Sequence, residues 1–200
     1  MNQIVSLSGG KDSTAMLLMM LERNEPIHSV VWFDTGWEFP EMYPHIEKLE
    51  KYTGLEVKRL KYHREFDEMM RTYNRWPAPM MRWCTGSKRD TIKKYGKQIS
   101  NFVHCIGFAS DEQKRTDSKS VSTNTRFPLI EYDVTEEKAL QYCKQHGFDW
   151  DGLYDVFDRV SCFCCPLGGI RDARKLRKNY PKLWEKVLVK NIVTGKHETL

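Results

Sequence analysis

The chain has 200 residues, 30% of them charged, with a net charge of +5 and six cysteines. This length fits one domain with a substantial core. The apolar runs are too short to cross a bilayer, so the sequence predicts neither a membrane helix nor a secretory signal. We therefore expect a cytoplasmic protein whose cysteines are metal ligands or reactive thiols rather than disulfides.

The first predicted strand is followed by a glycine pair in a polar turn. Residues 3–7 are strand-like, and residues 14–22 repeat apolar side chains at helical spacing. Adjacent glycines let the backbone turn sharply and expose N–H groups, and the positive end of the next helix favours an anion. We therefore predict a phosphate-binding turn, with an ordinary glycine turn as the weaker alternative. The turn consists of Ser8, Gly9, Gly10, Lys11, Asp12 and Ser13.

Two further strands, at residues 27–33 and 55–60, flank a helix at residues 40–52. This alternation predicts an α/β fold with an open, twisted, mostly parallel sheet and helices on both faces. Asp34 directly follows strand 27–33, at the sheet edge where such folds bind ligands. The sequence leaves two interpretations for this carboxylate, a ligand contact or a turn aspartate.

The middle of the chain predicts two helices and a fourth strand. A helix covers residues 66–73, and a loop that contains Cys84 leads into a basic helix. The fourth strand, residues 102–108, ends in a loop with Gly107 and Arg115. This loop belongs to the same ligand-binding edge of the sheet.

The region after this strand is polar at first. Residues 116–125 are rich in Ser and Thr and predict a surface flap. An apolar run at residues 128–130 predicts a short last strand. Thr135, followed by two glutamates, predicts the start of a helix that ends at His146.

The positive charge is concentrated near the C-terminus. Residues 171–190 contain eight Lys or Arg and two acidic residues, so this segment is +6 and the rest of the chain is −1. We predict a basic helix here. It has two interpretations, a solvated face or a contact for an anionic partner such as a nucleic acid.

Three of the six cysteines cluster within residues 162–165. Cys162 and Cys165 have the Cys-x-x-Cys spacing that turns two thiolates toward one metal or cluster. A third ligand must come from elsewhere, and Cys84 is the favoured candidate. Cys164 is a candidate fourth ligand, although neighbouring side chains on an extended chain point apart. The remaining cysteines, Cys105 in a strand and Cys143 in a helix, are interpreted as small buried hydrophobes.

These motifs resemble one protein superfamily. Residues 8–13 resemble the pyrophosphate loop of the PP-loop ATP pyrophosphatase superfamily, the adenine nucleotide alpha hydrolase-like proteins. Residues 159–166, with Ser161 in place of the usual glycine, resemble the cysteine loop of phosphoadenylyl sulfate (PAPS) reductases. The chain is also similar to sulfurtransferase members, including those of the DNA phosphorothioation type. Two shorter blocks that resemble this branch are residues 82–88 and 111–115.

The resemblance implies a single PP-loop α/β domain over residues 1–200, in which residues 148–200 form a cysteine-containing segment and a basic helix. The implied catalytic residues are Lys11, Asp12, Lys88 and Arg115. The implied nucleotide contacts are Ser8, Gly9, Gly10, Lys11, Asp12, Ser13, Asp34 and Gly107. The implied metal ligands are Cys84, Cys162 and Cys165, with Cys164 as a fourth candidate.

The resemblance further implies an enzyme that cleaves ATP with Mg²⁺ to AMP and pyrophosphate, adenylates an acceptor and lets sulfur displace the AMP. For the cysteines, a [4Fe-4S] cluster is the first interpretation, structural Zn²⁺ the second and a redox dithiol the third. With three cysteine ligands, one iron would be free for sulfide. The expected partners are a nucleic-acid acceptor and a sulfur-donor protein, without a membrane. The oligomeric state is open, a homodimer included.

Two other functions remain open. The first is a sulfonucleotide reductase that acts on phosphoadenylyl or adenylyl sulfate. Thioredoxin-linked reductases carry a nucleophilic cysteine in a C-terminal tail, whereas no cysteine follows Cys165 here. We therefore expect sulfur transfer rather than reduction, unless Cys164 acts as the nucleophile. The second is a nucleotide-binding protein without turnover.

Overall fold

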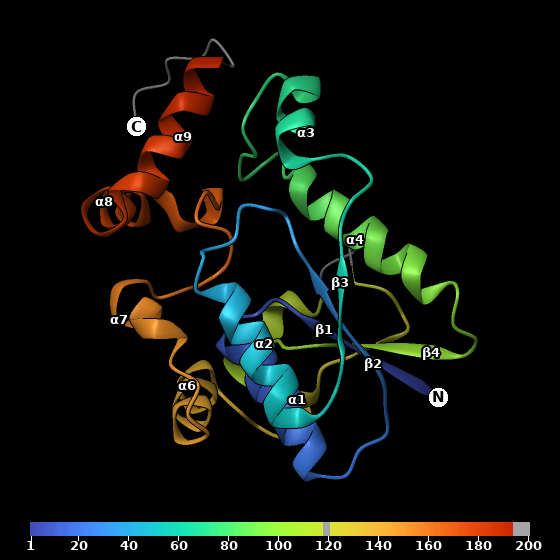
Figure 1. Cartoon of the computed structure of the whole chain (residues 1–200). Helices are drawn as coiled ribbons and strands as arrows, with labels where there is room; N and C mark the ends of the chain where they lie inside the picture. The colour runs from blue at the N-terminus through green and yellow to red at the C-terminus, as the bar shows by residue number, and fades with distance from the viewer. Residues whose placement is uncertain (118–120, 194–200) are drawn as a thin grey trace.

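The computed structural model describes residues 1–117 and 121–193. Five parallel strands form one sheet in the order β3-β2-β1-β4-β5 (Figure 1). This arrangement confirms the predicted open parallel α/β fold. The strands are β1 (Asn2–Leu7), β2 (Ile27–Phe33), β3 (Val57–Leu60), β4 (Phe102–Ile106) and β5 (Thr125–Arg126).

Helices surround this sheet. In Figure 1, α3, α4, α8 and α9 form the upper part of the molecule, and α1, α2 and α6 form the lower part. The helices are α1 (Lys11–Glu22), α2 (Met42–Thr53), α3 (Phe66–Tyr73), α4 (Trp83–Gly96), α5 (Pro128–Glu131), α6 (Glu136–Gln145), α7 (Leu153–Val156), α8 (Gly169–Asn179) and α9 (Pro181–Val193), with a short helix η1 (Ser110–Arg115). None of the helices in the described residues combines the length and apolar character that a bilayer crossing requires.

The strand order creates the crevice in which the site lies. The chain adds β2 and β3 on one side of β1 and then crosses to add β4 and β5 on the other side. The loops after β1 and β4 therefore run in opposite directions from neighbouring strands. Such a point at the carboxyl ends of parallel strands is where α/β folds bind ligands.

The C-terminal segment shares the core of the sheet. Phe148 and Leu153 are fully buried, and Leu176 on α8 and Val187 on α9 are at least nine-tenths buried in the same cluster as the strands. Burying such side chains contributes about 1.5–3 kcal/mol each. The cysteine loop, residues 161–168, is therefore fixed between packed segments.

Two predicted elements near the C-terminus are wrong. Residues 128–130 form helix α5 rather than a strand, because Pro128 occupies the first helical turn, where a missing N–H costs nothing. The last parallel strand is instead the two-residue β5, which begins at the last residue of the predicted flap. The single basic helix is two helices, α8 and α9, because Pro181 lacks the N–H needed to continue α8. Residues 118–120 of the flap and residues 194–200 lie outside the described part of the chain.

A buried histidine joins α1, α2 and the C-terminal segment. His45 on α2 is 5% exposed, and its Nε2 lies 3.1 Å from Thr14 Oγ1. Its ring stacks on Trp150 at 4.7 Å between centroids. Burial, with a contribution from Lys48, lowers the pKa of His45 from 6.5 to about 4. The ring is therefore neutral in the folded protein at neutral pH.

This pKa predicts a pH dependence of stability. A histidine whose folded pKa is lowered gains stability above its unfolded pKa and loses it as the pH falls through the folded pKa. Between pH 6.5 and 4, the loss attributable to His45 should reach about 3 kcal/mol. Urea unfolding across this range should show a shallower pH dependence for His45→Asn, whereas exposed His28→Asn should follow the wild type. Parallel curves for wild type and His45→Asn would contradict the assignment.

Candidate functional site

The predicted phosphate loop connects β1 to α1. Gly9 has a φ of +82°, and a Cβ there would lie 2.3 Å from the terminal methyl of Met42, so this position requires glycine. The serines close the loop, because the N–H of Ser8 donates to Ser13 Oγ at 3.1 Å and that of Gly10 donates to Ser8 Oγ at 3.3 Å. The loop is therefore held in shape by its own side chains.

Lys11 is a buried cation balanced by two carboxylates. Its Nζ lies 2.8 Å from Asp12 Oδ1 and 2.8 Å from Glu136 Oε2. Burial lowers the pKa of Lys11, but the two carboxylates outweigh burial and hold this pKa above its usual value. Burial also raises the pKa of Asp12, against the opposing effect of Lys11. An anion at this loop must therefore compete with the two carboxylates or arrive with a metal cation that they can bind.

The C-terminal segment covers the loop. Tyr154 on α7 accepts a hydrogen bond from the N–H of Lys11 at 2.7 Å. The indole N–H of Trp150 donates to the carbonyl oxygen of Gly9 at 2.7 Å. A Cβ on Gly10 would lie 3.0 Å from the Tyr154 hydroxyl and 3.1 Å from the carbonyl oxygen of Val160, so a larger residue would push against this cover. The Tyr154 hydroxyl thus accepts the hydrogen bond that the backbone N–H of Lys11 would otherwise donate to a phosphate oxygen.

The loop after β4 lies against the start of α1. A Cβ on Gly107 would be 2.9 Å from the backbone N and Cα of Ser13, so this glycine permits the close approach. Arg115, on η1, forms an ion pair with Glu112, and its guanidinium stacks over the ring of Phe108 at 4.0 Å. The structure thus brings Gly107 to the phosphate loop and orients Arg115 through its neighbours.

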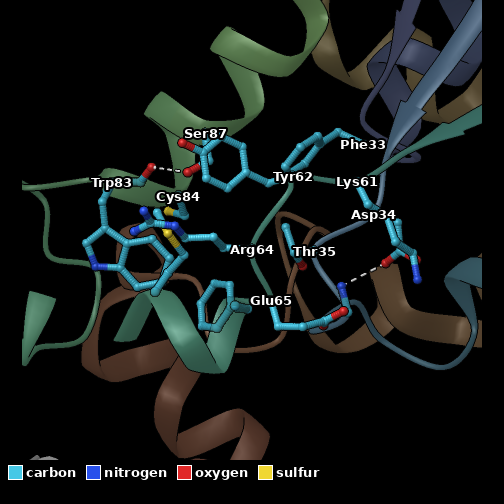
Figure 2. A pocket seen from close by; sticks show the side chains of 13 residues that line it. Phe33, Asp34, Thr35, Lys61, Tyr62, Arg64, Glu65, Trp83, Cys84 and Ser87 are labelled. Atoms are coloured by element: carbon cyan, nitrogen blue, oxygen red, sulfur yellow. Dashed lines mark hydrogen bonds and ion pairs between the residues drawn. The ribbon is translucent and has the colours of Figure 1, made fainter. Parts of the chain in front are cut away.

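Asp34 lies at the end of β2 in a small cavity of about 40 Å³ (Figure 2). Its carboxylate accepts hydrogen bonds from the N–H of Gly36 at 2.8 Å and the hydroxyl of Tyr43 at 3.1 Å, and lies 3.5 Å from Lys61 Nζ. Asp34 thus forms a turn and also lines a cavity, so both interpretations of it remain compatible with the structure. Figure 2 shows further lining residues, including Thr35, Tyr62, Arg64, Trp83, Cys84 and Ser87.

The structure brings four cysteines together. The Cys162 thiol shares hydrogen bonds with those of Cys164 and Cys165, and Cys84 interacts electrostatically with Cys165. Cys84 lies in the first turn of α4 rather than in a loop, because Trp83 is buried against Phe66 and begins the helix. The other two cysteines, Cys105 and Cys143, are fully buried elsewhere, as predicted.

The pKa values of three of these thiols are raised. Hydrogen bonding to Cys164 raises the pKa of Cys162, and hydrogen bonding to Cys162 raises that of Cys165. Burial raises the pKa of Cys84. Because the thiolate is the nucleophile, these directions weaken the redox-dithiol interpretation.

Lys88 lies with the thiols and not at the phosphate loop. It interacts electrostatically with Glu38, Cys162 and Cys84, and burial lowers its pKa. Glu38 is 8% exposed, and burial raises its pKa to about 7 against the hydrogen bond from Thr35 and the charge of Lys88. The backbone of Glu38 also forms a β-bridge with Cys162. The site therefore has two centres, the phosphate loop and the thiol group, of which Lys88 belongs to the second.

A metal at the thiols would require rearrangement. Within residues 1–117 and 121–193, no three His, Cys, Asp or Glu side chains are placed to hold one metal ion. The donor chemistry does fit a thiolate-bound centre, because Cys162 interacts with Cys164 and Cys165, Cys84 interacts with Cys165, and Lys88 would offset thiolate charge. The contacts link the thiols in pairs, so a bound centre needs a shift of the cysteine loop.

Three residues of the site were not predicted from the sequence. Glu136 was predicted only as an acidic residue of a first helical turn, and Tyr154 had no assigned role. Glu38 is four residues after Asp34 and could have been noted as a carboxylate in an apolar stretch. Its partners lie far away in sequence, so only the fold reveals its burial.

Comparison with known sequences identifies one family. The phosphoadenosine phosphosulfate reductase domain matches residues 2–167. An uncharacterized protein of Methanocaldococcus jannaschii is 30% identical over 197 residues, which cover 92% of this chain and 40% of that protein. The adenosine 5′-phosphosulfate reductase of Halalkalibacterium halodurans is 26% identical over 161 residues, 75% of this chain and 68% of that enzyme. The chain spans 40% and 45% of the length of two M. jannaschii relatives that it matches.

Solved structures share the fold. The phosphoadenylyl-sulfate reductase of Candida auris, in a phosphate complex, has a TM-score of 0.57 at 14% identity and covers 78% of each chain. The U34-tRNA thiolase NcsA of Methanococcus maripaludis, with its [4Fe-4S] cluster, has a TM-score of 0.56 at 18% identity and covers 98% of this chain and 73% of that one. At these identities the likeness establishes the PP-loop fold alone.

The cover over the loop predicts the effect of one substitution. Tyr154→Phe removes the hydroxyl that occupies the Lys11 N–H and keeps the ring, so a phosphate group should bind more tightly by about fivefold, the equivalent of one hydrogen bond. Isothermal titration with pyrophosphate would measure the change. Tyr142→Phe, a tyrosine of α6 for which no bond to the loop is seen, serves as the control. Weaker binding by Tyr154→Phe would instead make this hydroxyl a phosphate ligand.

Proposed function

The chain belongs to the phosphoadenosine phosphosulfate reductase domain family, an enzyme family, and we propose that it uses ATP to drive sulfur transfer. In this proposal an acceptor oxygen attacks the α-phosphorus of ATP, pyrophosphate leaves, and sulfur then displaces AMP from the adenylated acceptor. One observation carries the proposal. The buried Lys11 and its two carboxylates lie at the start of α1, where the loop geometry suits phosphates, and a thiol group lies in the same fold.

The phosphates would be held at the loop. Backbone N–H groups of residues 8–13 and the positive end of α1 stabilise them, and Lys11 balances the charge that develops on pyrophosphate. Asp12 and Glu136 offer carboxylate oxygens, which Mg²⁺ prefers together with phosphate oxygens. Arg115 would add a second cation after release from Glu112. Asp34 and Gly107 would border the nucleotide on either side of the loop.

The thiols would handle the sulfur. Cys84, Cys162 and Cys165 would hold a [4Fe-4S] cluster, with Cys164 as a further candidate ligand and Zn²⁺ as the alternative metal. A cluster held by three cysteines would supply one iron with an open coordination position for sulfide. Lys88 is placed to offset the negative charge of the thiolates.

The acceptor would be a nucleic acid. Arg174, Arg177, Lys178 and Lys182 on α8 and α9 are exposed, and none of them has a side-chain ion pair with another described residue. When such unpaired cations contact phosphates, they release the counterions bound to the nucleic acid, and this release favours binding. A sulfur-donor protein completes the proposal.

A sulfonucleotide reductase is the second candidate. The observation that favours it is the match to adenosine 5′-phosphosulfate reductase, a relative at 26% identity. The same loop would then hold an adenylyl sulfate. A thiolate would attack the sulfonate sulfur and expel the adenosine phosphate, and a second thiolate would attack the resulting S-sulfonated cysteine, form a disulfide with it and release sulfite. Sulfite release from such a substrate with a dithiol reductant, without pyrophosphate release from ATP, would make this the function.

The first test concerns the carboxylates at Lys11. Asp12→Asn and Glu136→Gln should each lower Mg²⁺-dependent pyrophosphate release from ATP about a hundredfold, because each removes a carboxylate ligand of the Mg²⁺ that would bind the leaving pyrophosphate. Glu137→Gln, which alters the next residue of α6, is the matched control. A coupled pyrophosphate assay with acceptor nucleic acid measures the rate. ATP binding with no release in the wild type would indicate a protein without turnover.

The second test concerns the thiols. After anaerobic purification, Cys84→Ser, Cys162→Ser and Cys165→Ser should each lose most of the bound iron, because a thiolate ligand is lost. The fully buried Cys105 and Cys143, changed to Ser, are the matched controls, and circular dichroism verifies their folding. Iron analysis and the visible spectrum give the result. If the protein contained stoichiometric zinc and no iron, the site would be a structural zinc site and not an iron–sulfur cluster.

A further inference from the structure

The chain has a second strongly basic segment. Residues 71–94 contain seven Lys or Arg and one Asp, a net charge of +6, which equals that of residues 171–190. Because the whole chain is +5, the rest of it is −7. The basic charge is therefore concentrated on two segments rather than one. The new segment comprises the end of α3, a loop and most of α4.

Three cations at the start of α4 and along it are exposed and unpaired, whereas Lys88 is half-buried beside Glu38. Arg82, Arg89 and Lys93 are spaced by seven and four residues, which places them along one side of the helix. In the described part of the chain, none of the three side chains has an ion pair or a hydrogen bond. Elsewhere, Arg59 and Arg126 are neutralised by glutamates. An unpaired row of cations on a helix suits a polyanion.

Apolar surface accompanies these charges. Tyr73, at the end of α3, is 47% exposed and stacks on Trp83 at 5.8 Å with 9° between the rings. Met80 is fully exposed and Met81 is 46% exposed in the loop before α4. A fixed ring with one open face, beside cations, is the arrangement on which unpaired nucleobases stack.

We propose that residues 71–94 bind a single-stranded nucleic acid, with its phosphates along Arg82, Arg89 and Lys93 and a base on Tyr73. The proposal rests on the proposed function, because it identifies this strand as the acceptor. A duplex would not offer the unstacked bases that Tyr73 can use. The strand would pass over Cys84, which lies two residues from Arg82 in the first turn of α4.

The neighbouring groove favours this path. A groove of about 580 Å³ lies between α3 and α9, and its lining includes the acidic Glu65, Asp67 and Glu68 with only Arg71 and Lys186 as cations. Its carboxylates repel phosphates, so a strand is directed along α4 and not into the groove. In Figure 1, α4 lies on the side of the molecule opposite α8 and α9, so the two basic segments are separate surfaces.

The experiment measures binding of a fluorescein-labelled single-stranded RNA of mixed sequence by anisotropy at several salt concentrations. Changing Arg82, Arg89 and Lys93 together to Ala should reduce the slope of log affinity against log salt by about 2, since each phosphate contact contributes about 0.7. The matched control changes Lys51, Lys138 and Lys144, exposed lysines of α2 and α6, together to Ala.

The Tyr73→Ala variant distinguishes the contribution of base stacking from that of phosphate binding. It should weaken RNA binding by about tenfold or more and leave binding of inorganic polyphosphate unchanged, because stacking requires a base. Equal slopes for wild type and the α4 variant, or no RNA binding by the wild type, would overturn the proposal. Equal loss in the control variant would do the same. Pyrophosphate release from ATP is measured separately, so RNA binding that depends on α4 without such release would refute only the proposed chemistry.

Discussion

The charge of Lys11 is the constraint on which the arrangement of the site depends. A buried ammonium group needs carboxylate partners, and one of them, Glu136, comes from the first turn of α6. This ion pair therefore fixes α6 against α1, and the thiol of Cys143 on α6 reaches the carbonyl oxygen of Lys11 at 3.4 Å. The segment that follows α6 then carries Trp150 and Tyr154 onto the loop. The phosphate loop is thus shaped by residues more than a hundred positions away.

Much of the fold could be predicted from the sequence because its signals are local. Apolar strands and amphipathic helices repeat at short spacing, and Thr135 does cap α6 by accepting the N–H of Lys138. The phosphate loop was equally visible, since glycines and serines at a strand-to-helix turn lie within six residues. The errors occurred where proline decides between conformations. Pro128 starts a helix, and Pro181 separates two helices, although each lies in an apolar or basic run without another break.

The candidate site was less predictable because its interactions join distant residues. The four cysteines were grouped by resemblance, and the structure brings them together, but their roles as ligands remain predictions. Lys88 was assigned to phosphate chemistry, whereas it lies beside Glu38 and the thiols. No periodicity predicts that Glu38 is buried, because its environment is created by the β-bridge to Cys162 and by α4. The second basic segment is also not apparent from the net charge of the chain, because acidic residues elsewhere cancel it in the total.

The two centres and the basic segments differ in how their charges are balanced. At the loop, Lys11 is buried and already paired, so added salt can screen it little, and an anion must displace a carboxylate or bring a cation. The exposed cations of α4, α8 and α9 face solvent. Their contacts with phosphates would release counterions, and this contribution to affinity becomes smaller as the salt concentration rises. Nucleotide binding and polyanion binding should therefore respond differently to ionic strength. This difference would make the two proposed activities separable in one protein, because salt that releases a polyanion from the exposed cations leaves the buried ion pairs of Lys11 intact.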